Sequence, residues 1–155
     1  MSLARKAIDW WALGGGPLLA AIVVINVANV VGGFFGKPFS GDFELTQMLV
    51  AAAAFMFLPY CQLNRQNVTA DIFTTSLSKT AQRRLSALGS AVAEVFAVLL
   101  LWRMFQGMLD QKAYNLASTI LEIPIWWAYV PILLSLALLI VASAITLIED
   151  LSGES

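Results

Sequence analysis

The 155-residue chain contains no histidine, one cysteine (Cys61) and few charged residues, which make up 12% of the sequence. Without histidine, an imidazole-ligated haem and most zinc sites are excluded. A single cysteine forms no intrachain disulfide, and no imidazole is present to activate it as a nucleophile. The sequence also lacks a glycine loop with the spacing of a phosphate cradle. We therefore expect that the chain is not an enzyme and binds no cofactor, metal ion or nucleic acid.

Apolar residues, in contrast, are abundant. They make up 59% of the sequence, and the mean hydropathy is +0.79, far above that of a soluble domain. A helix of roughly 20 residues crosses a bilayer core of about 30 Å, so the chain has room for four such spans. The apolar runs place these spans at about 11–35, 44–63, 85–109 and 125–148. The predicted fold is an all-α integral membrane protein with a single transmembrane domain over residues 1–155.

Turn and capping residues predict how the spans begin. Three glycines, Gly14 to Gly16, precede Pro17 and predict a flexible start to the first span, with Pro17 in its first turn. Ser40 or Asp42 is predicted to cap the second span, and Glu44 lies in its first turn, where the helix dipole favours a carboxylate.

The stretch from Asn64 to Arg84 is the one long polar break in the chain. Apolar residues within 72–77, close to basic residues, predict a short interfacial helix at the level of the lipid headgroups. Basic residues near the spans divide unequally between the two sides, and this bias places both termini and the polar break in the cytoplasm. Six basic residues lie on the cytoplasmic side: Arg5, Lys6, Arg65, Lys79, Arg83 and Arg84. Two lie on the other side, Lys37 and Lys112.

The connection before the fourth span carries two further signals. Thr119 and Glu122 have the spacing of a capping box and predict a short helix. Trp126 and Trp127 then open the fourth span in the manner of aromatic residues at a membrane interface.

Polar and small residues inside the spans indicate where helices meet. Asn26 and Asn29 lie on one face of the first span and either bond to a neighbouring helix or contact a substrate. The run Ala51–Ala54 allows a neighbouring helix to approach closely. Glu94 lies near the bilayer midplane and serves either packing, with Asn26, Asn29 or a partner subunit, or ion handling. Arg103 either snorkels to the interface or meets a carboxylate on another helix.

The order of several motifs along the chain resembles a known family. They are the acid of Glu44-Leu-Thr-Gln opening the second span, Arg65 to Asp71 in the polar break, Gly89, and the aromatic run from Ile123 to Tyr129. Together they resemble the DctQ-like, four-span small membrane subunit of tripartite ATP-independent periplasmic (TRAP) transporters. Members of that family often have histidine where this chain has Asn67, which argues against a proton-switching role for the break.

The resemblance implies a scaffold subunit in a bacterial or archaeal inner membrane, surrounded by lipid and paired with a large polytopic subunit. That partner would hold the substrate and sodium sites and use the sodium gradient to take up an organic acid delivered by a periplasmic binding protein. The residues expected at partner interfaces are Asn26, Asn29, Glu44, Ala51, Ala54, Arg65, Asp71, Glu94, Arg103, Trp126 and Trp127.

Two other functions stay open at this point. The chain could be a haem-free membrane anchor or assembly subunit of another complex, such as a respiratory enzyme. It could also be a small exporter that works alone, although no inverted repeat of the kind common in self-sufficient transporters is found.

Overall fold

The computed structural model describes residues 2–64 and 79–152. These residues form four α-helices: α1 (Ser2–Phe34), α2 (Asp42–Leu63), α4 (Lys79–Ala113) and α5 (Trp126–Ser152). Each helix has an apolar stretch long enough to cross a membrane. Within the described residues no strand occurs, and only one isolated bridge joins Ala117 to Pro124. The structure therefore confirms the predicted all-helical class with four potential membrane spans.

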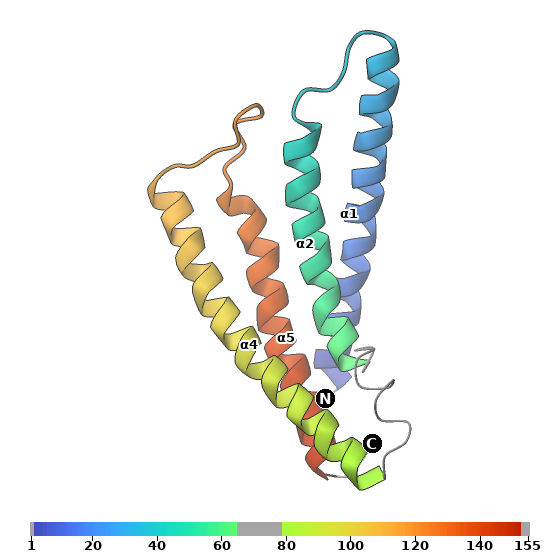
Figure 1. The fold of residues 1–155 in the computed structure, drawn as a ribbon, viewed down its shortest axis with the longest axis vertical. Coiled ribbons are helices and arrows are strands. Elements are labelled where there is room, and N and C mark those ends of the chain that lie inside the picture. Colours follow the sequence, from blue (N-terminus) through green and yellow to red (C-terminus); the bar gives the residue numbers. More distant parts are fainter. Residues whose placement is uncertain (1, 65–78, 153–155) are drawn as a thin grey trace.

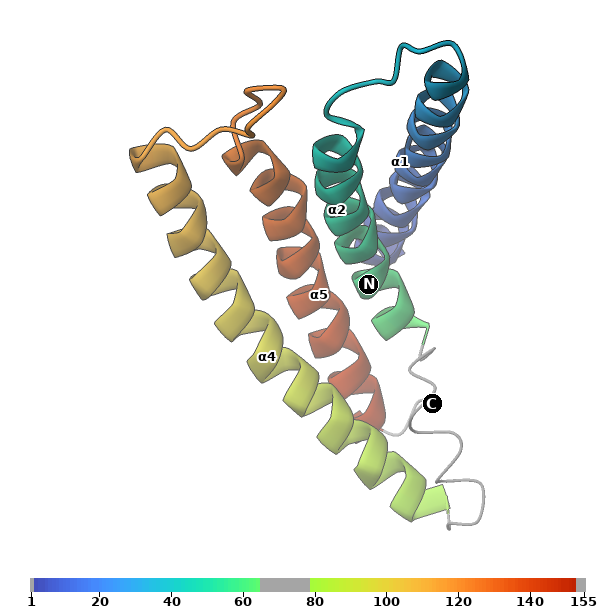
Figure 2. The same ribbon diagram turned by 45° about the horizontal axis from the view of Figure 1, so that its top comes forward.

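The four helices lie side by side in the order α1, α2, α5, α4 (Figures 1 and 2). Helix α5 packs between α2 and α4, whereas α1 packs on α2 and touches α5 only slightly. Among the described residues α4 does not pack along α1 or α2, and it reaches α2 through the side-chain contact between Gln62 and Ser90. Both termini lie where α2 ends and α4 begins (Figure 1), which we call the terminal end. The opposite end, with connections 35–41 and 114–125, is the loop end.

Packing is tightest at the terminal end, where one apolar cluster joins three helices. Ile8 of α1, Leu63 of α2, and Ala142 and Ile145 of α5 are all buried there. Lipid tails are as apolar as these side chains, so the cluster stabilises the fold through van der Waals packing rather than through escape from water.

Helix α1 runs without interruption through the three glycines and Pro17, so the predicted flexible start is wrong. The glycines serve a close approach between helices instead. A Cβ atom on Gly15 would lie 2.9 Å from Phe57 Cζ, and one on Gly14 would lie 3.1 Å from Met56 Cε. Both neighbours belong to α2, so the missing side chains let α1 and α2 pack together.

The start of α2 also differs from the prediction. Gly41, in the left-handed region with φ 102°, precedes the helix, and no side chain caps it, so the expected cap by Ser40 or Asp42 is wrong. Asp42 instead accepts a hydrogen bond from Asn29 Nδ2 of α1 at 2.7 Å. Its carboxylate is engaged between helices and does not turn back to the backbone of α2.

The capping-box pattern at 119–122 does not produce a helix. Glu122 has φ 53°, in the left-handed region that ends helical geometry. The segment is a turn, closed where the Ser118 N–H donates to the Ile123 carbonyl at 2.9 Å. Three neighbouring N–H groups bond to Glu44, as described below.

The predicted interfacial helix at 72–77 lies outside the described residues, as do Arg65 and Asp71.

Candidate functional site

A buried polar cluster joins α2, α4 and α5 near the terminal end. Gln62 Nε2 of α2 donates to Thr146 Oγ1 of α5 at 3.2 Å and lies 3.5 Å from Ser90 Oγ of α4. The two hydroxyl oxygens are 3.3 Å apart, and all three residues are buried. In an apolar surrounding these groups hydrogen-bond best with one another, so the cluster holds the three helices in register.

Glu94 of α4 has its partner on α5. The fully buried Ser143 donates its hydroxyl proton to Glu94 Oε2, and the Ser143 oxygen also lies 2.9 Å from the Leu139 carbonyl. The expected alternatives, Asn26 and Asn29, bond elsewhere. The half-buried acid therefore takes part in a contact between α4 and α5.

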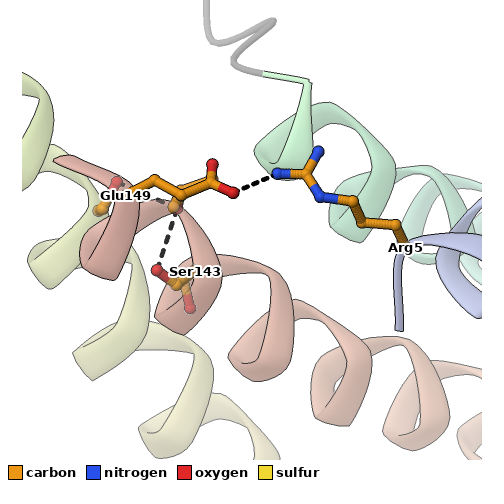
Figure 3. Close-up of polar contacts among 5 residues, drawn as sticks. Arg5, Ser143 and Glu149 are labelled. Carbon is orange, nitrogen blue, oxygen red and sulfur yellow. Dashed lines mark hydrogen bonds and ion pairs between the residues drawn. The ribbon is translucent and has the colours of Figure 1, made fainter. Parts of the chain in front are cut away.

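Two contacts between α1 and α5 are not predicted by any local pattern in the sequence. Arg5 pairs with Glu149 at the terminal end (Figure 3). Trp11 Nε1 donates to the buried Ser135 Oγ at 2.9 Å. The ion pair is partly exposed, and such pairs contribute little, typically about 0–1 kcal/mol. Both contacts link residues more than 120 positions apart, which local patterns do not reveal.

The two asparagines of α1 bond towards α2, in agreement with the packing interpretation. Asn26 Nδ2 donates to Thr46 Oγ1 at 3.1 Å and to the Ile22 carbonyl at 2.8 Å. Asn29 donates to Asp42, and its Oδ1 accepts the Phe39 N–H at 2.8 Å. Asn29 therefore ties the α1–α2 connection to both helices.

Glu44 holds the α4–α5 connection against the start of α2. Its Oε1 accepts the N–H groups of Thr119 and Ile120 at 2.8 and 2.9 Å, and its Oε2 accepts that of Leu121 at 3.1 Å. A carboxylate with three backbone donors fixes the connection in one conformation. The sequence predicts Glu44 only as a first-turn acid, because its partners lie 75 to 77 positions later.

Leu121 also packs directly on Gly41. A Cβ atom built on Gly41 would lie 2.5 Å from Leu121 Cγ, so only glycine leaves room for this side chain. Together with Glu44, this contact joins the two connections of the loop end into one surface.

The remaining predicted interface residues lie at or near the helix surface. Trp126 packs edge-on against the exposed Trp127 with ring centroids 6.2 Å apart, and Lys112 Nζ lies 5.3 Å from the Trp126 ring. Arg103 is exposed, and its guanidinium lies 5.9 Å from the Trp102 ring.

The alanine run of α2 divides between the interior and the surface. Ala52 and Ala53 are buried, whereas Ala51 is half-buried and Ala54 is exposed. The middle of the run therefore supplies the packing face, and Ala54 is free for a contact outside the chain.

Within residues 2–64 and 79–152, no three histidine, cysteine or acidic side chains gather as a metal site would require. The polar groups described above link helices and connections to one another. Four apolar helices held in this way define a small multi-pass membrane protein.

Comparison with known proteins identifies its family. The family model for tripartite ATP-independent periplasmic transporters, DctQ component, matches residues 22–153. The chain therefore belongs to this family of transporter membrane components, which is not a family of enzymes. Comparisons with curated proteins and with solved structures found no match.

Proposed function

We propose that the chain is a scaffold that braces the large polytopic subunit of a TRAP transporter. The observation that carries this proposal is that two polar side chains of the membrane-span helices, Glu94 and Gln62, bond to neighbouring helices of the same chain. Glu94 bonds to Ser143, and Gln62 joins Ser90 and Thr146, so these contacts tie α4, α5 and α2 into one body. A subunit built in this way serves as a static support against which a partner moves.

The transport chemistry would then belong to the other subunits. The large subunit binds sodium and the substrate and uses the sodium gradient to import an organic acid. A periplasmic binding protein delivers that acid. This part of the proposal is supported by membership in the DctQ family.

The subunit lies in the inner membrane as a single transmembrane domain, with both termini in the cytoplasm and a short interfacial helix near 72–77. The excess of basic residues around the polar break supports this orientation. The shared position of the two termini at one end of the molecule agrees with it (Figure 1).

The loop end would face the periplasm and contact the binding protein. Phe43, Tyr114 and Ile120 are well exposed there, beside the exposed acid Glu122. Glu44 and Gly41 hold the two connections in place, so the surface is already formed before the binding protein docks.

Copurification and reconstitution test the proposal. The tagged chain, expressed with the large membrane subunit of its transporter, should retain that subunit in detergent. Liposomes with both subunits and the binding protein should take up the organic acid when a sodium gradient is applied, and omission of this chain should abolish uptake. Recovery of a redox subunit instead would favour the haem-free anchor, and transport by this chain alone would favour the exporter.

A further inference from the structure

Helix α4 carries a row of exposed residues along a side that none of the other described helices covers. Successive members are separated by four or three positions, so they lie on one side of the helix. The eight exposed residues of this row, called the α4 seam, are Leu85, Gly89, Val92, Phe96, Leu99, Arg103, Gln106 and Asp110.

The α4 seam points away from α5. The contacts of α4 with α5 run through Ser90 and Glu94, which bond to Thr146 and Ser143. At 100° per residue, Ser90 and Glu94 lie on the side of the helix roughly opposite to the row through Phe96. Among the described residues, the side of α4 with Ser90 and Glu94 packs on α5, and the opposite side, with the α4 seam, is exposed.

Lipid alone is a poor neighbour for the α4 seam because of Arg103. Lys112, beside the Trp126 ring, marks the level of the membrane interface at the loop end. Arg103 lies nine positions below it, about 13 Å along the helix axis. Among the described residues Arg103 forms no ion pair with a carboxylate, and its guanidinium lies beside the Trp102 ring. Asp110 is seven positions, about 10 Å, away along the same row. A guanidinium at this depth normally faces a protein partner or a water-filled cavity.

The exposed side of α1 provides the contrast. From Pro17 to Phe34 this helix carries no charged residue, and its outward side chains include Val23, Val24 and Val27. Such a surface is fully compatible with lipid tails. The two edges of the helix layer therefore differ, and the edge formed by α4 is the one that requires a partner.

Two features of the α4 seam suit a helix as that partner. Gly89 has open space where a Cβ atom would stand, so another backbone can approach closely there. A shallow apolar hollow lies beside it, lined by Ala91, Val92, Val95 and Phe96. A large side chain of a neighbouring helix would fill this hollow.

We propose that the α4 seam binds one transmembrane helix of the large polytopic subunit, and that this helix presents a carboxylate to Arg103. This inference rests on the proposed function. A second copy of the chain does not suit the seam. Two copies share one orientation in the membrane, so a twofold axis along the membrane normal would place Arg103 against Arg103 at the same depth, where like charges repel.

Site-specific photocrosslinking tests where the large subunit docks. A benzophenone amino acid replaces Phe96 or Leu99 of the α4 seam, or Val23 or Val27 of α1 as controls. Phe96 and Val23 are both 61% exposed, which makes them a matched pair. Light should join the chain to the tagged large subunit from the seam positions only. Adducts from α1 instead, adducts of two copies of this chain, or no adduct from the seam would overturn the proposal.

Substitution of Arg103 tests the carboxylate. Arg103→Leu should reduce recovery of the large subunit about tenfold or more, because it leaves a buried acid without its partner. Arg103→Lys should restore most of the recovery, and Lys37→Leu, at an exposed position in the α1–α2 connection, should leave it unchanged. The same Arg103→Leu change should improve membrane insertion of the chain expressed alone, because it removes a charge from the apolar region. Unchanged recovery, or a parallel loss of insertion, would refute the proposed pairing.

Different results would refute the proposed function and the assignment of the binding surface to the α4 seam. If the wild-type chain retains no large polytopic subunit, the proposed function is wrong. If it retains that subunit but crosslinks to it through α1, only the assignment to the α4 seam is wrong.

Discussion

Replacing Gly41 with alanine adds one methyl group where the α4–α5 connection meets the start of α2. Gly41 has φ 102°, and a side chain in the left-handed region costs roughly 1–2 kcal/mol. The new Cβ atom would lie 2.5 Å from Leu121 Cγ and 2.8 Å from its Cδ1. Because Cγ is a branch point rather than a flexible tip, Leu121 must leave its position, which costs about 1–3 kcal/mol more. We expect Gly41→Ala to lower the free energy of unfolding by about 2–5 kcal/mol in total.

Gly36→Ala is the matched control. Gly36 also has a positive φ, of 70°, but a Cβ atom there would meet nothing within 4 Å. Its substitution should cost only the backbone strain, about 1–2 kcal/mol. The difference between the two variants, about 1–3 kcal/mol, then measures the contact between Leu121 and the start of α2.

The free energy of unfolding can be measured by titrating the purified chain with a denaturing detergent while tryptophan fluorescence is followed. The five tryptophans of the sequence provide the signal. The same two glycine substitutions are then made in a Leu121→Ala background, which completes a double-mutant cycle. Removing the leucine side chain should remove the extra loss at Gly41 and leave the loss at Gly36 unchanged.

Two results would refute this reasoning. Equal losses for Gly41→Ala and Gly36→Ala would mean that Leu121 does not pack on Gly41. An extra loss that persists in the Leu121→Ala background would mean that another group is responsible.

Three further predictions concern the polar contacts. Glu44→Ala should speed hydrogen exchange about tenfold or more at the three amides that the Glu44 carboxylate binds. Asp42→Asn should leave this exchange unchanged, and unchanged protection after Glu44→Ala would contradict the prediction. Glu94→Gln should leave sodium-driven uptake largely intact, because its amide oxygen still accepts the Ser143 proton, and complete loss of uptake in an assembled complex would show otherwise. Gln62→Leu should lower the free energy of unfolding by about 0.6–1.5 kcal/mol in the detergent titration, since it removes the amide that donates to Thr146; a gain in stability would count against the cluster.

The four membrane-span helices among the described residues are expected from the sequence because a long, mostly uncharged run has no alternative in a membrane. Every backbone polar group must be satisfied within the segment, so each run becomes a helix. The same rule explains why the flexible start at Gly14 to Gly16 is wrong. In water three glycines favour a break, but α1 continues here and uses the missing side chains to approach Met56 and Phe57.

Contacts between distant segments could not be predicted in the same way. Glu94 was expected to serve either packing, with Asn26, Asn29 or a partner subunit, or ion handling, but its donor in the structure, Ser143, lies 49 positions away on a helix with no distinguishing signal. The capping-box pattern of Thr119 and Glu122 failed because Glu44 binds the backbone of that turn from another helix. Local patterns indicate which residues need a partner, and the packing of the helices decides which partner they find.

The position of α5 between α2 and α4 has a consequence for biosynthesis. As the chain leaves the ribosome, α1 and α2 can pair at once, whereas α4 enters the membrane before α5, the helix on which it packs, has been made. During that interval Glu94 lacks Ser143 and Ser90 lacks Thr146. Arrival of α5 thus completes the attachment of α4 to the α1–α2 hairpin, and a nonsense mutation within residues 126–152 would remove all or part of the helix on which α4 packs.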